Sequence, residues 1–466
     1  MRVICFVLVL GAVACGSVGE RPPDGRCATA VECTDPAAPF CVDSECSASC
    51  SVAADCVEAD RGVCAADGAC VGCEVASDCG SEAPICDDSA RACRGCAADA
   101  ECGGGVCIEA EGACVADADV AFVADLGSDT GACTRATPCA TLTFAITQAG
   151  TARRVIHVLG GTLNTGSVTL GGDYVLDGED TTIGSAGATT LTIRAPANIT
   201  VEGFRLVAPT AGTTPAISVS GFGAVGILHD LQITGTGLAV TVTNSAEVTL
   251  ARSHIGSLAT TSTVQCTNAK LRVDQCVLEQ TIVNDGNTQC EATVTRNRFE
   301  SSRDGSVQLT GGQLVMENNL VIHRDGFNDS ILAVNLRPGS TIRFNTIVNT
   351  TALPSDGAAL SCDNAIEVTS NIFAYNSGHP ITGLGCATRF SVFDDQSTTA
   401  AGTGNQLTGI DQIFVNRGTG DYHLSASSVA RAGAEPGQNM VKIDFDGQPR
   451  PSPSDTTADS GAFEAP

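Results

Sequence analysis

A repeated order of apolar and polar positions runs through the second half of the chain. Each copy reads apolar, two variable residues, Asn, one variable residue, apolar, and the clearest copies cover residues 294–299, 315–320, 342–347 and 368–373. Looser copies, in which another residue replaces the Asn, begin at Val201, Leu228, Leu250 and Val273. Successive copies begin 21 to 27 residues apart. A nearly constant period in the twenties, rich in β-branched residues, predicts a solenoid in which each copy forms one coil.

The apolar positions of the repeat predict the interior of this solenoid. Parallel stacking places equivalent residues of successive coils about 4.8 Å apart, so the first and last positions form internal columns. The Asn position predicts a further column, of Asn297, Asn318, Asn345 and Asn371. Asn tolerates left-handed backbone conformations and its amide bonds along a stack, so we assign this column to corners of the coils. A structural role is favoured over a ligand site for these residues.

Four cysteines fall at matching places of neighbouring coils. Cys266 lies 16 residues after the start of its copy and Cys290 lies 17 after the start of the next. Cys362 and Cys386 are related in the same way, at offsets of 20 and 18. Since neighbouring coils lie within disulfide reach, we predict the pairs Cys266–Cys290 and Cys362–Cys386.

Two further predictions complete the cysteines of this region. Cys133 and Cys139 are close in sequence and are expected to form a local disulfide. Cys276 is then left without a partner, as a buried free thiol.

The segment that precedes the repeats predicts a cap. Leu142, Ala145, Ile146 and Ala149 are apolar at helical spacing, which indicates a short amphipathic helix. A helix laid over the first coil covers the exposed sheet edge and prevents pairing with another chain.

The two ends of this region resemble those of a known superfamily. Gly127-Ser-Asp129, Gly131, Pro138, Thr141-Leu142 and Ala145-Ile146 match the start of right-handed parallel β-helix proteins of the pectate-lyase-like superfamily. Residues 411–415, 420–424, 444–450 and 459–464 resemble the closing segment of bacterial surface β-helix proteins, although Ser428 and Arg431 depart from its usual Pro and Asp. The resemblance implies an all-β, right-handed parallel β-helix solenoid of about ten coils over residues 120–466, with a helix cap and a C-terminal segment that closes the stack.

A cysteine-rich region, residues 27–114, precedes the solenoid. It holds four units of four cysteines that begin 23 residues apart: Cys27, Cys33, Cys41 and Cys46; Cys50, Cys56, Cys64 and Cys70; Cys73, Cys79, Cys86 and Cys93; and Cys96, Cys102, Cys107 and Cys114. Such units have too few apolar residues to fold alone, so two disulfides in each are expected, with three connectivities open. Similar repeats occur in bacterial surface lipoproteins, and we interpret the region as a stalk.

Zinc is the rival interpretation of these cysteines, because Cys70 and Cys73, and likewise Cys93 and Cys96, have the spacing of metal ligands. These pairs straddle the unit boundaries and no His lies in the region, so disulfides are favoured and no metal is predicted. An acid precedes the second cysteine of each unit, but no EF-hand loop accompanies these acids.

The N-terminus predicts export. An apolar run from Val3 to Val13 has the length of a secretory signal and is too short to span a membrane. Small residues before Cys15 resemble a lipobox, so residues 1–14 are interpreted as a signal peptide, Cys15 as the lipidated residue and residues 15–26 as a tether. The expected location is the outer membrane or cell surface, with the anchor inserted in the outer membrane. Cleavage without lipidation, and hence secretion, is the alternative.

Charge and composition narrow the partners. The net charge is −27 and the chain has only two lysines, so a nucleic-acid partner is not expected. There is no Trp and only three Tyr, whereas sugar-binding clefts commonly use such rings. The acidity would also repel a polyuronate.

Relatives with the resembled fold include lyases and hydrolases of acidic polysaccharides, but their motifs are missing here. No Arg-x-Lys occurs, and Gly378-His379 continues with Pro380 rather than Gly. The candidate site is where coils lengthen, at residues 323–329 and 350–357. There His323, Asp325, Asp329, Asp356 and Asp363 are candidates as acid/base groups or calcium ligands, although solvated loop residues are the favoured interpretation.

Three hypotheses about function follow. The favoured one is a non-enzymatic surface lipoprotein that displays its solenoid on the stalk for adhesion or for binding a polysaccharide or protein. The alternatives are a polysaccharide lyase or hydrolase, and a calcium-dependent glycan-binding module. Three or more titratable side chains in a groove on the flank would favour the enzyme. A flank of scattered Thr, Ser and Asn would favour the first hypothesis.

Overall fold

The computed structural model divides the chain into two compact units, Met1–Ala116 and Asp117–Pro466. It describes residues 62–466 except 185–186, 210–213, 257–263, 280, 285–287, 302–304, 324–328, 351–356, 364–365, 375–379, 384, 395–401, 438–440, 454 and 466. Before residue 62 it describes only 6–7, 13–14, 40–42, 45–47, 50, 53 and 56. Of the predicted signal peptide and tether it thus describes only the short strands β1 (Phe6–Val7) and β2 (Val13–Ala14), and Cys15 lies outside the described residues.

The first unit is a series of small antiparallel hairpins. The hairpin strands are β3 (Phe40–Val42) with β4 (Glu45–Ser47), β5 (Val63–Cys64) with β6 (Cys70–Val71), β7 (Ile85–Asp87) with β8 (Ala92–Arg94), and β9 (Val106–Ile108) with β10 (Ala113–Val115). The 3-10 turns η3 (Ala76–Asp78) and η4 (Asp99–Cys102) precede the last two hairpins. Each hairpin places the third and fourth cysteines of its unit opposite each other.

Disulfides resolve the connectivity that the sequence leaves open. In the second, third and fourth units the first cysteine pairs with the third and the second with the fourth: Cys50–Cys64, Cys56–Cys70, Cys73–Cys86, Cys79–Cys93, Cys96–Cys107 and Cys102–Cys114. In the first group of four cysteines, Cys27 and Cys33 lie outside the described residues. The two disulfides of each described unit join its hairpin to the preceding loop.

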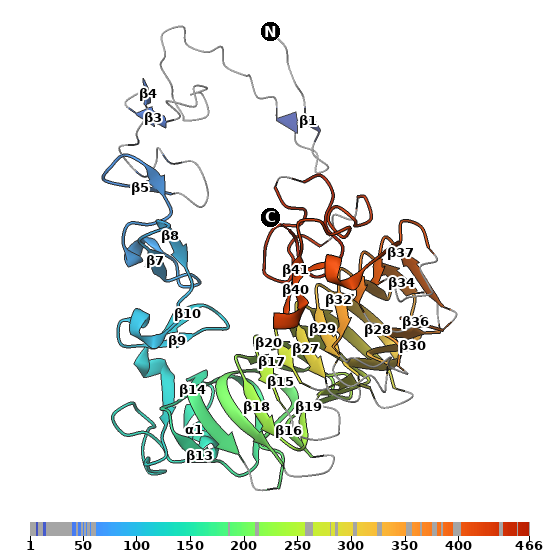
Figure 1. Ribbon diagram of the computed structural model, residues 1–466. Coiled ribbons are helices and arrows are strands. Elements are labelled where there is room, and N and C mark those ends of the chain that lie inside the picture. The colour runs from blue at the N-terminus through green and yellow to red at the C-terminus, as the bar shows by residue number, and fades with distance from the viewer. Residues whose placement is uncertain are drawn as a thin grey trace. The chain divides into compact units, whose positions relative to one another are not determined.

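The second unit is an all-β parallel solenoid of about nine turns (Figure 1). Each coil contributes up to three strands to three parallel faces, in the order face 1, face 2, face 3. Face 1 contains β16 (Pro215–Ser220), β19 (Leu238–Thr243), β22 (Val264–Thr267), β25 (Ile282–Val283), β30 (Ile331–Leu336), β33 (Leu360–Cys362) and β36 (Ile381–Thr382). Three long strands serve more than one face: β14 (Val168–Gly184), β15 (Leu191–Ala208) and β28 (Val307–Glu317).

The other two faces run along the whole solenoid. Face 2 contains β11 (Val120–Val123), β12 (Val155–Val158), β17 (Ala224–His229), β20 (Glu247–Ala251), β23 (Ala269–Asp274), β26 (Cys290–Thr295), β31 (Thr341–Arg343), β34 (Ile366–Thr369) and β37 (Cys386–Arg389). Face 3 contains β13 (Thr162–Asn164), β18 (Gln232–Gly235), β21 (His254–Ile255), β24 (Val277–Leu278), β27 (Arg298–Ser301), β29 (Leu320–His323), β32 (Thr346–Asn349), β35 (Ile372–Ala374), β38 (Val392–Asp394) and β39 (Gln406–Thr408).

The predicted repeat sets the coil register except at one copy. The residues that pair along face 2 are Val201, Leu228, Leu250, Val273, Val294, Met316, Ile342 and Val368, all fully buried. The prediction places Val315 in this column, one residue too early. The internal column at the other end of the repeat accordingly contains Val321, not Leu320.

The same shift corrects the asparagine column. The buried ladder consists of Asn297, Asn319, Asn345 and Asn371, and Asn318 is not part of it. The left-handed corner position belongs to the residue before each ladder Asn: Arg296, Asn318, Phe344 and Ser370 have φ of 54°, 54°, 55° and 56°. The ladder amides therefore point into the stack, where they bond from coil to coil.

The three predicted solenoid disulfides are present. Cys266 is the penultimate residue of β22 on face 1 and bonds to Cys290, which begins β26 on face 2 in the next coil, with Cα atoms 5.7 Å apart. Cys362–Cys386 repeats this arrangement at 5.7 Å, and the local pair Cys133–Cys139 spans 4.9 Å. Cys276 is a buried free thiol.

Helix α1 (Leu142–Ala149) covers the first coil, as predicted. It buries Leu142, Ala145 and Ala149 in the solenoid core, and Ile146 packs at its edge. The Thr141 side chain caps the helix by accepting from the Phe144 N–H, and Asp129 accepts from the Thr141 N–H at 3.0 Å and its hydroxyl at 2.9 Å. The short turn η5 (Asp117–Asp119) leads into β11.

The C-terminal segment, residues 409–465, lies along the side of the solenoid. It contains η6 (Ile410–Gln412), β40 (Phe414–Asn416), η7 (Arg417–Thr419) and β41 (Asp421–Leu424). Its apolar residues Ile413, Phe414, Tyr422 and Phe463 pack on outward residues of face 3, among them Ile322, Val348 and Ile372. The expected closure of the stack is thus a lateral cover over the last coils (Figure 1).

Across the described residues, no helix has the length and hydropathy required to cross a bilayer.

Candidate functional site

His323, the first predicted site residue, lies inside the solenoid wall. It ends β29 on the same side of the strand as Val321, which faces the core, and its side chain is fully buried. Its carbonyl accepts from the Thr350 N–H of the next coil at 3.0 Å. A buried inward ring does not line an open groove.

The two predicted carboxylates that the structure describes, Asp329 and Asp363, accept hydrogen bonds from backbone N–H groups. Asp329 accepts from the Ala358 N–H at 2.8 Å, just before β30 and β33. Asp363 follows β33 and accepts from the Asn335 N–H, at 2.7 Å, near the far end of β30. These two residues lie at opposite ends of one strand pair, so they do not share a site. Asp325 and Asp356 lie outside the described residues.

The central outward row of face 1 contains no ionisable side chain among the described residues. The row is Thr169, Thr192, Ser218, Thr241, Gln265, Val283, Gln308, Leu332, Ser361 and Thr382. Hydroxyls and amides donate and accept hydrogen bonds but provide neither a proton donor nor a proton acceptor with a pKa near neutrality. The row suits binding rather than proton transfer.

A shallow groove on face 2 is lined by several charged side chains. It encloses about 350 Å³ and is lined by Glu247, Lys270, Arg272 and Glu291. Lys270 binds Glu247 at 2.6 Å, and Arg337 binds Glu291 at 3.2 Å, with side chains that are about half exposed. The hydrogen bond to Glu247 raises the pKa of Lys270 above its ordinary value. Lys270 is therefore a poor general base, and both carboxylates are already paired.

A row of charged residues that the sequence analysis missed follows the corner between faces 2 and 3. The residues that pair along it are His157, Asp177, Glu202, His229, Ala251, Asp274, Thr295, Glu317, Arg343, Thr369 and Arg389. Within it, His157 bonds Asp177 at 2.6 Å. From Glu202 to Thr369, each member directly follows the residue that its coil contributes to the buried column of face 2, so its position can be predicted once the register of the repeat is known.

Ion pairs, most of them between neighbouring coils, occupy much of this row. His229 lies 2.6 Å from Asp230, which also binds Arg252 at 2.6 Å. Burial alone raises the pKa of Asp230, but the hydrogen bonds from His229 and Arg252 outweigh it and lower the pKa to about 2. Arg296 similarly binds Asp274, and Arg343 binds Glu317. The row is thus largely a seam of paired charges along the corner.

A larger groove lies where the C-terminal segment meets face 3, beside the lengthened coils. It encloses about 780 Å³, and its lining includes Arg298 and Ile322 of face 3, Thr350 and, from the C-terminal segment, Arg417 and Tyr422. Thr350 begins residues 350–357, one of the two lengthened segments in which the sequence predicts a site. The groove therefore lies near the predicted location, but none of the predicted site residues that the structure describes is among its lining residues.

A buried polar cluster fastens the C-terminal segment. Arg450 donates to the carbonyls of Asp459 and Gly461, and its guanidinium lies 3.4 Å from Glu464 and stacks on the Phe344 ring. The carboxylates of Asp444, Asp459 and Glu464 accept backbone N–H groups of the same segment. These residues carry the resemblance of the closing segment, and their contacts are structural.

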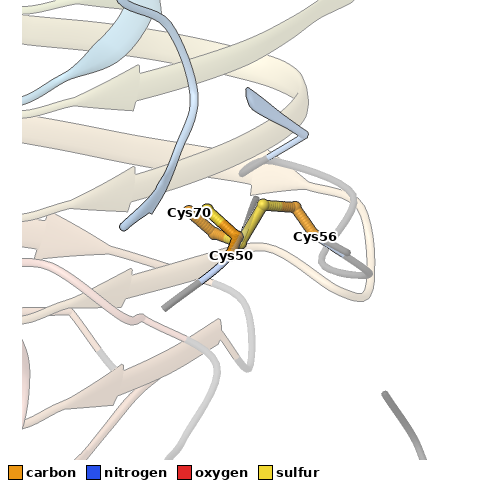
Figure 2. Close-up of side chains that lie close together, drawn as sticks. All are labelled: Cys50, Cys56 and Cys70. Atoms are coloured by element: carbon orange, nitrogen blue, oxygen red, sulfur yellow. A yellow bond between two sulfur atoms is a disulfide. The ribbon is translucent and has the colours of Figure 1, made fainter. Parts of the chain in front are cut away.

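In the cysteine-rich unit, sulfur atoms cluster because disulfides lie side by side. Cys50, Cys56 and Cys70 bring their sulfurs within 4.8 Å of one another (Figure 2), and equivalent trios occur in the next two units. Each of these sulfurs is bonded in a disulfide, so it is not the thiolate that zinc requires.

The acids that precede the second cysteines are bound as well. Asp78 accepts from the Glu74 and Val75 N–H groups, and Glu101 accepts from the Ala97 N–H at 2.7 Å. The hydrogen bonds to Arg94 and Ala97 lower the pKa of Glu101 to about 2. In these two described units, the acid shapes its own loop.

A scan against protein-family models and a search of curated proteins both find no match to this chain.

Proposed function

We propose that the protein is a non-enzymatic, exported surface protein whose solenoid binds a ligand. In this proposal Cys15 is the lipid anchor and the cysteine-rich units form a stalk. The solenoid is a right-handed β-helix of the pectate-lyase-like type, built for recognition rather than turnover. The anchor and export rest on the N-terminal sequence, and they agree with the number of disulfides.

The central outward row of face 1 carries this proposal. Its Thr and Ser residues agree with the flank of Thr, Ser and Asn that the first hypothesis expects, whereas the row also contains Gln, Val and Leu and has no Asn. The backbone contacts of Asp329 and Asp363 add to the same conclusion, because each carboxylate already has a structural partner.

The enzyme hypothesis retains one supporting observation, the groove of face 2 with Glu247, Lys270, Arg272 and Glu291. These four titratable side chains in one groove exceed the minimum of three that would favour an enzyme. Their mutual pairing, their exposure and the raised pKa of Lys270 favour a solvated ion-pair network instead.

Screening the full chain for turnover and binding tests the proposal. Pectate, alginate and a neutral glucan such as dextran are supplied with and without Ca²⁺, and new chain ends and retention on the immobilised protein are both measured. We expect no new chain ends from any of them, and retention only of a saccharide that is not a polyuronate, because the net charge of −27 repels polyanions. Turnover that is abolished by Asp329→Ala, or by Glu247→Ala with Glu291→Ala, would establish an enzyme. Glu279→Ala, on face 3 and 44% exposed, is the matched control.

A further inference from the structure

A histidine of the C-terminal segment connects two parts of that segment. His423 lies on β41, where its Nδ1 is 2.6 Å from a carboxylate oxygen of Asp421. Its Nε2 is 2.8 Å from a carboxylate oxygen of Asp446, which belongs to the turn of residues 444–447. The ring also contacts Phe463, with ring centroids 4.5 Å apart. His423 thus joins the hairpin of β40 and β41 to the terminal part of the chain, residues 430–465.

The two hydrogen bonds require a charged ring. An ionised carboxylate only accepts hydrogen bonds, and a neutral imidazole has a single N–H, so both ring nitrogens donate only when each carries a proton. Partial burial alone lowers the pKa of His423, but the hydrogen bonds to Asp421 and Asp446 outweigh it and raise the pKa above its ordinary value. The hydrogen bond from His423 in turn lowers the pKa of Asp421, which keeps that carboxyl ionised.

The terminal part of the chain is fixed to the solenoid by hydrogen bonds. The Gly461 N–H donates to the Ser370 carbonyl at 2.8 Å, and the Ala462 N–H donates to the Thr346 hydroxyl at 2.9 Å. All four residues are buried. The terminal part therefore holds Asp446 in a fixed position beside the last coils.

The hairpin contacts the solenoid through apolar packing and through its turn. Phe414, Tyr422 and Leu424 belong to the cluster that covers the outward residues of face 3. Arg417, in the turn between the two strands, donates to the Asn349 carbonyl at 2.9 Å. Residues 417–420 and Tyr422 also line the groove of about 780 Å³ beside face 3. A movement of the hairpin would therefore open this groove and uncover part of face 3.

We propose that the hairpin of β40 and β41 is a lid over face 3, which charged His423 holds closed against Asp446 and which loosens when the ring loses a proton. The neutral ring keeps one N–H, so one of the two carboxylates then faces a nitrogen lone pair. The charged groups that act on the ring are Asp421 from its own strand and Asp446 from the turn packed against it, whereas Phe463 is neutral.

The raised pKa of His423 fixes the direction of the pH dependence. The stabilisation is fully present below the pKa of the unfolded chain, near 6.5, and it is lost as pH rises through the folded pKa. The lid is thus closed at acid pH and loosened at alkaline pH. This inference goes beyond the proposed function, since the movement of the lid does not depend on what the solenoid binds.

Hydrogen exchange of the full chain, measured by mass spectrometry at pH 5.5 and pH 8.5 and corrected for intrinsic exchange rates, tests the lid. All proteins carry Glu464→Gln, because burial raises the pKa of Glu464 to about 7 and its titration would affect the same segment. The side chain of His423 is 52% exposed, so solvent screening limits its effect. We expect the opening of residues 414–424 to increase about two- to fivefold at the higher pH, while β29 and β32 stay protected.

Two substitutions of the histidine separate its charge from its contacts. His423→Gln removes the charge, so the hairpin should open as readily at pH 5.5 as at pH 8.5. His423→Arg keeps a positive charge that can reach both carboxylates, so the hairpin should stay closed at both pH values. His254→Gln is the matched control, because His254 lies on face 3, is 47% exposed and pairs with Glu279 instead of the hairpin. It should show the same pH dependence as the protein with both histidines.

Three results would overturn the lid. These are equal opening of the hairpin at the two pH values, a pH dependence that persists in His423→Arg, and opening of β29 and β32 together with the hairpin. None of them bears on the proposed function, which the screen for binding and turnover tests separately.

Discussion

The buried asparagine ladder shows how single residues hold successive coils together. Asn345 accepts from both the Asn319 N–H and the Asn319 side chain, and donates to the carbonyls of Met316 and Arg343. A buried amide is tolerated only if its groups are satisfied, and here each amide serves its own coil and its neighbours. Cys276 continues the column, where burial raises the pKa of its thiol to about 12.

Replacing one ladder residue should therefore destabilise the solenoid. Asn345→Ala leaves the buried N–H of Asn319 without an acceptor, and we expect a loss of about 3 kcal/mol in the free energy of unfolding. Urea denaturation monitored by circular dichroism measures it. Asn164→Ala, at an exposed position of β13, should change it by less than about 0.5 kcal/mol. Equal stability of Asn345→Ala and the wild type would contradict this role of the ladder.

At the scale of elements, the outward residues of face 3 are apolar where the C-terminal segment covers them. In the early coils the outward side of face 3 carries exposed Arg205, Gln232 and His254. In the later coils, Leu320, Ile322, Val348 and Ile372 occupy outward positions and are buried beneath the C-terminal segment. The Arg450 cluster fastens that segment, so the cover depends on a few buried charges.

Those charges predict a dependence of stability on pH. Burial raises the pKa of Glu464 to about 7, despite the opposing charge of Arg450, and burial also raises the pKa of Asp459. A carboxyl whose folded pKa is raised stabilises the fold below its unfolded pKa, near 4.5, and that stability is lost as pH rises through 7. The wild type should thus lose about 3 kcal/mol more than Glu464→Gln between pH 5 and pH 8.

Urea denaturation at the two pH values measures this difference. Glu291→Gln, at a half-exposed position of face 2, is the control and should follow the wild type. A wild-type profile parallel to that of Glu464→Gln would show that Glu464 is already ionised in the folded chain across this range.

At the scale of the whole molecule, the two units are stabilised in different ways. The solenoid has a continuous apolar core along its length. Among the described residues of the first unit, the buried apolar residues are few, mainly cysteines with Val71, Val106 and Ile108. The folding of this first compact unit therefore depends on its disulfides, as expected for cysteine-rich repeats of 23 residues.

We expect reduction of the disulfides to unfold residues 62–114 while the solenoid stays folded. Losing a disulfide costs a small domain about 2–5 kcal/mol, more than a unit with so little core can tolerate. We expect dithiothreitol to expose residues 62–114 to limited proteolysis while residues 120–465 stay resistant, since Cys266, Cys290 and Cys362 are buried. Mass spectrometry of the fragments locates the cuts, with the unreduced protein as control. Simultaneous cleavage of both units would refute this difference.

The candidate site was less predictable than the fold. The lengthened coils were located from spacing alone, and the large groove does begin beside them at Thr350. Its two arginines come from residues 298 and 417, which are 119 positions apart in the sequence. No local pattern links such residues, because their proximity depends on the C-terminal segment folding back over face 3.

The sequence by itself determined the parallel coils, the helix cap and the three solenoid disulfides, because a period of one coil dictates which residues stack. Only the tertiary structure decided the register at Met316. Both 315–320 and 316–321 fit the repeat, since Leu320 and Val321 are both apolar and both buried. Val321 faces the core and Leu320 faces the C-terminal segment. Where a strand is covered on both sides, hydrophobicity alone does not show which residues face the core.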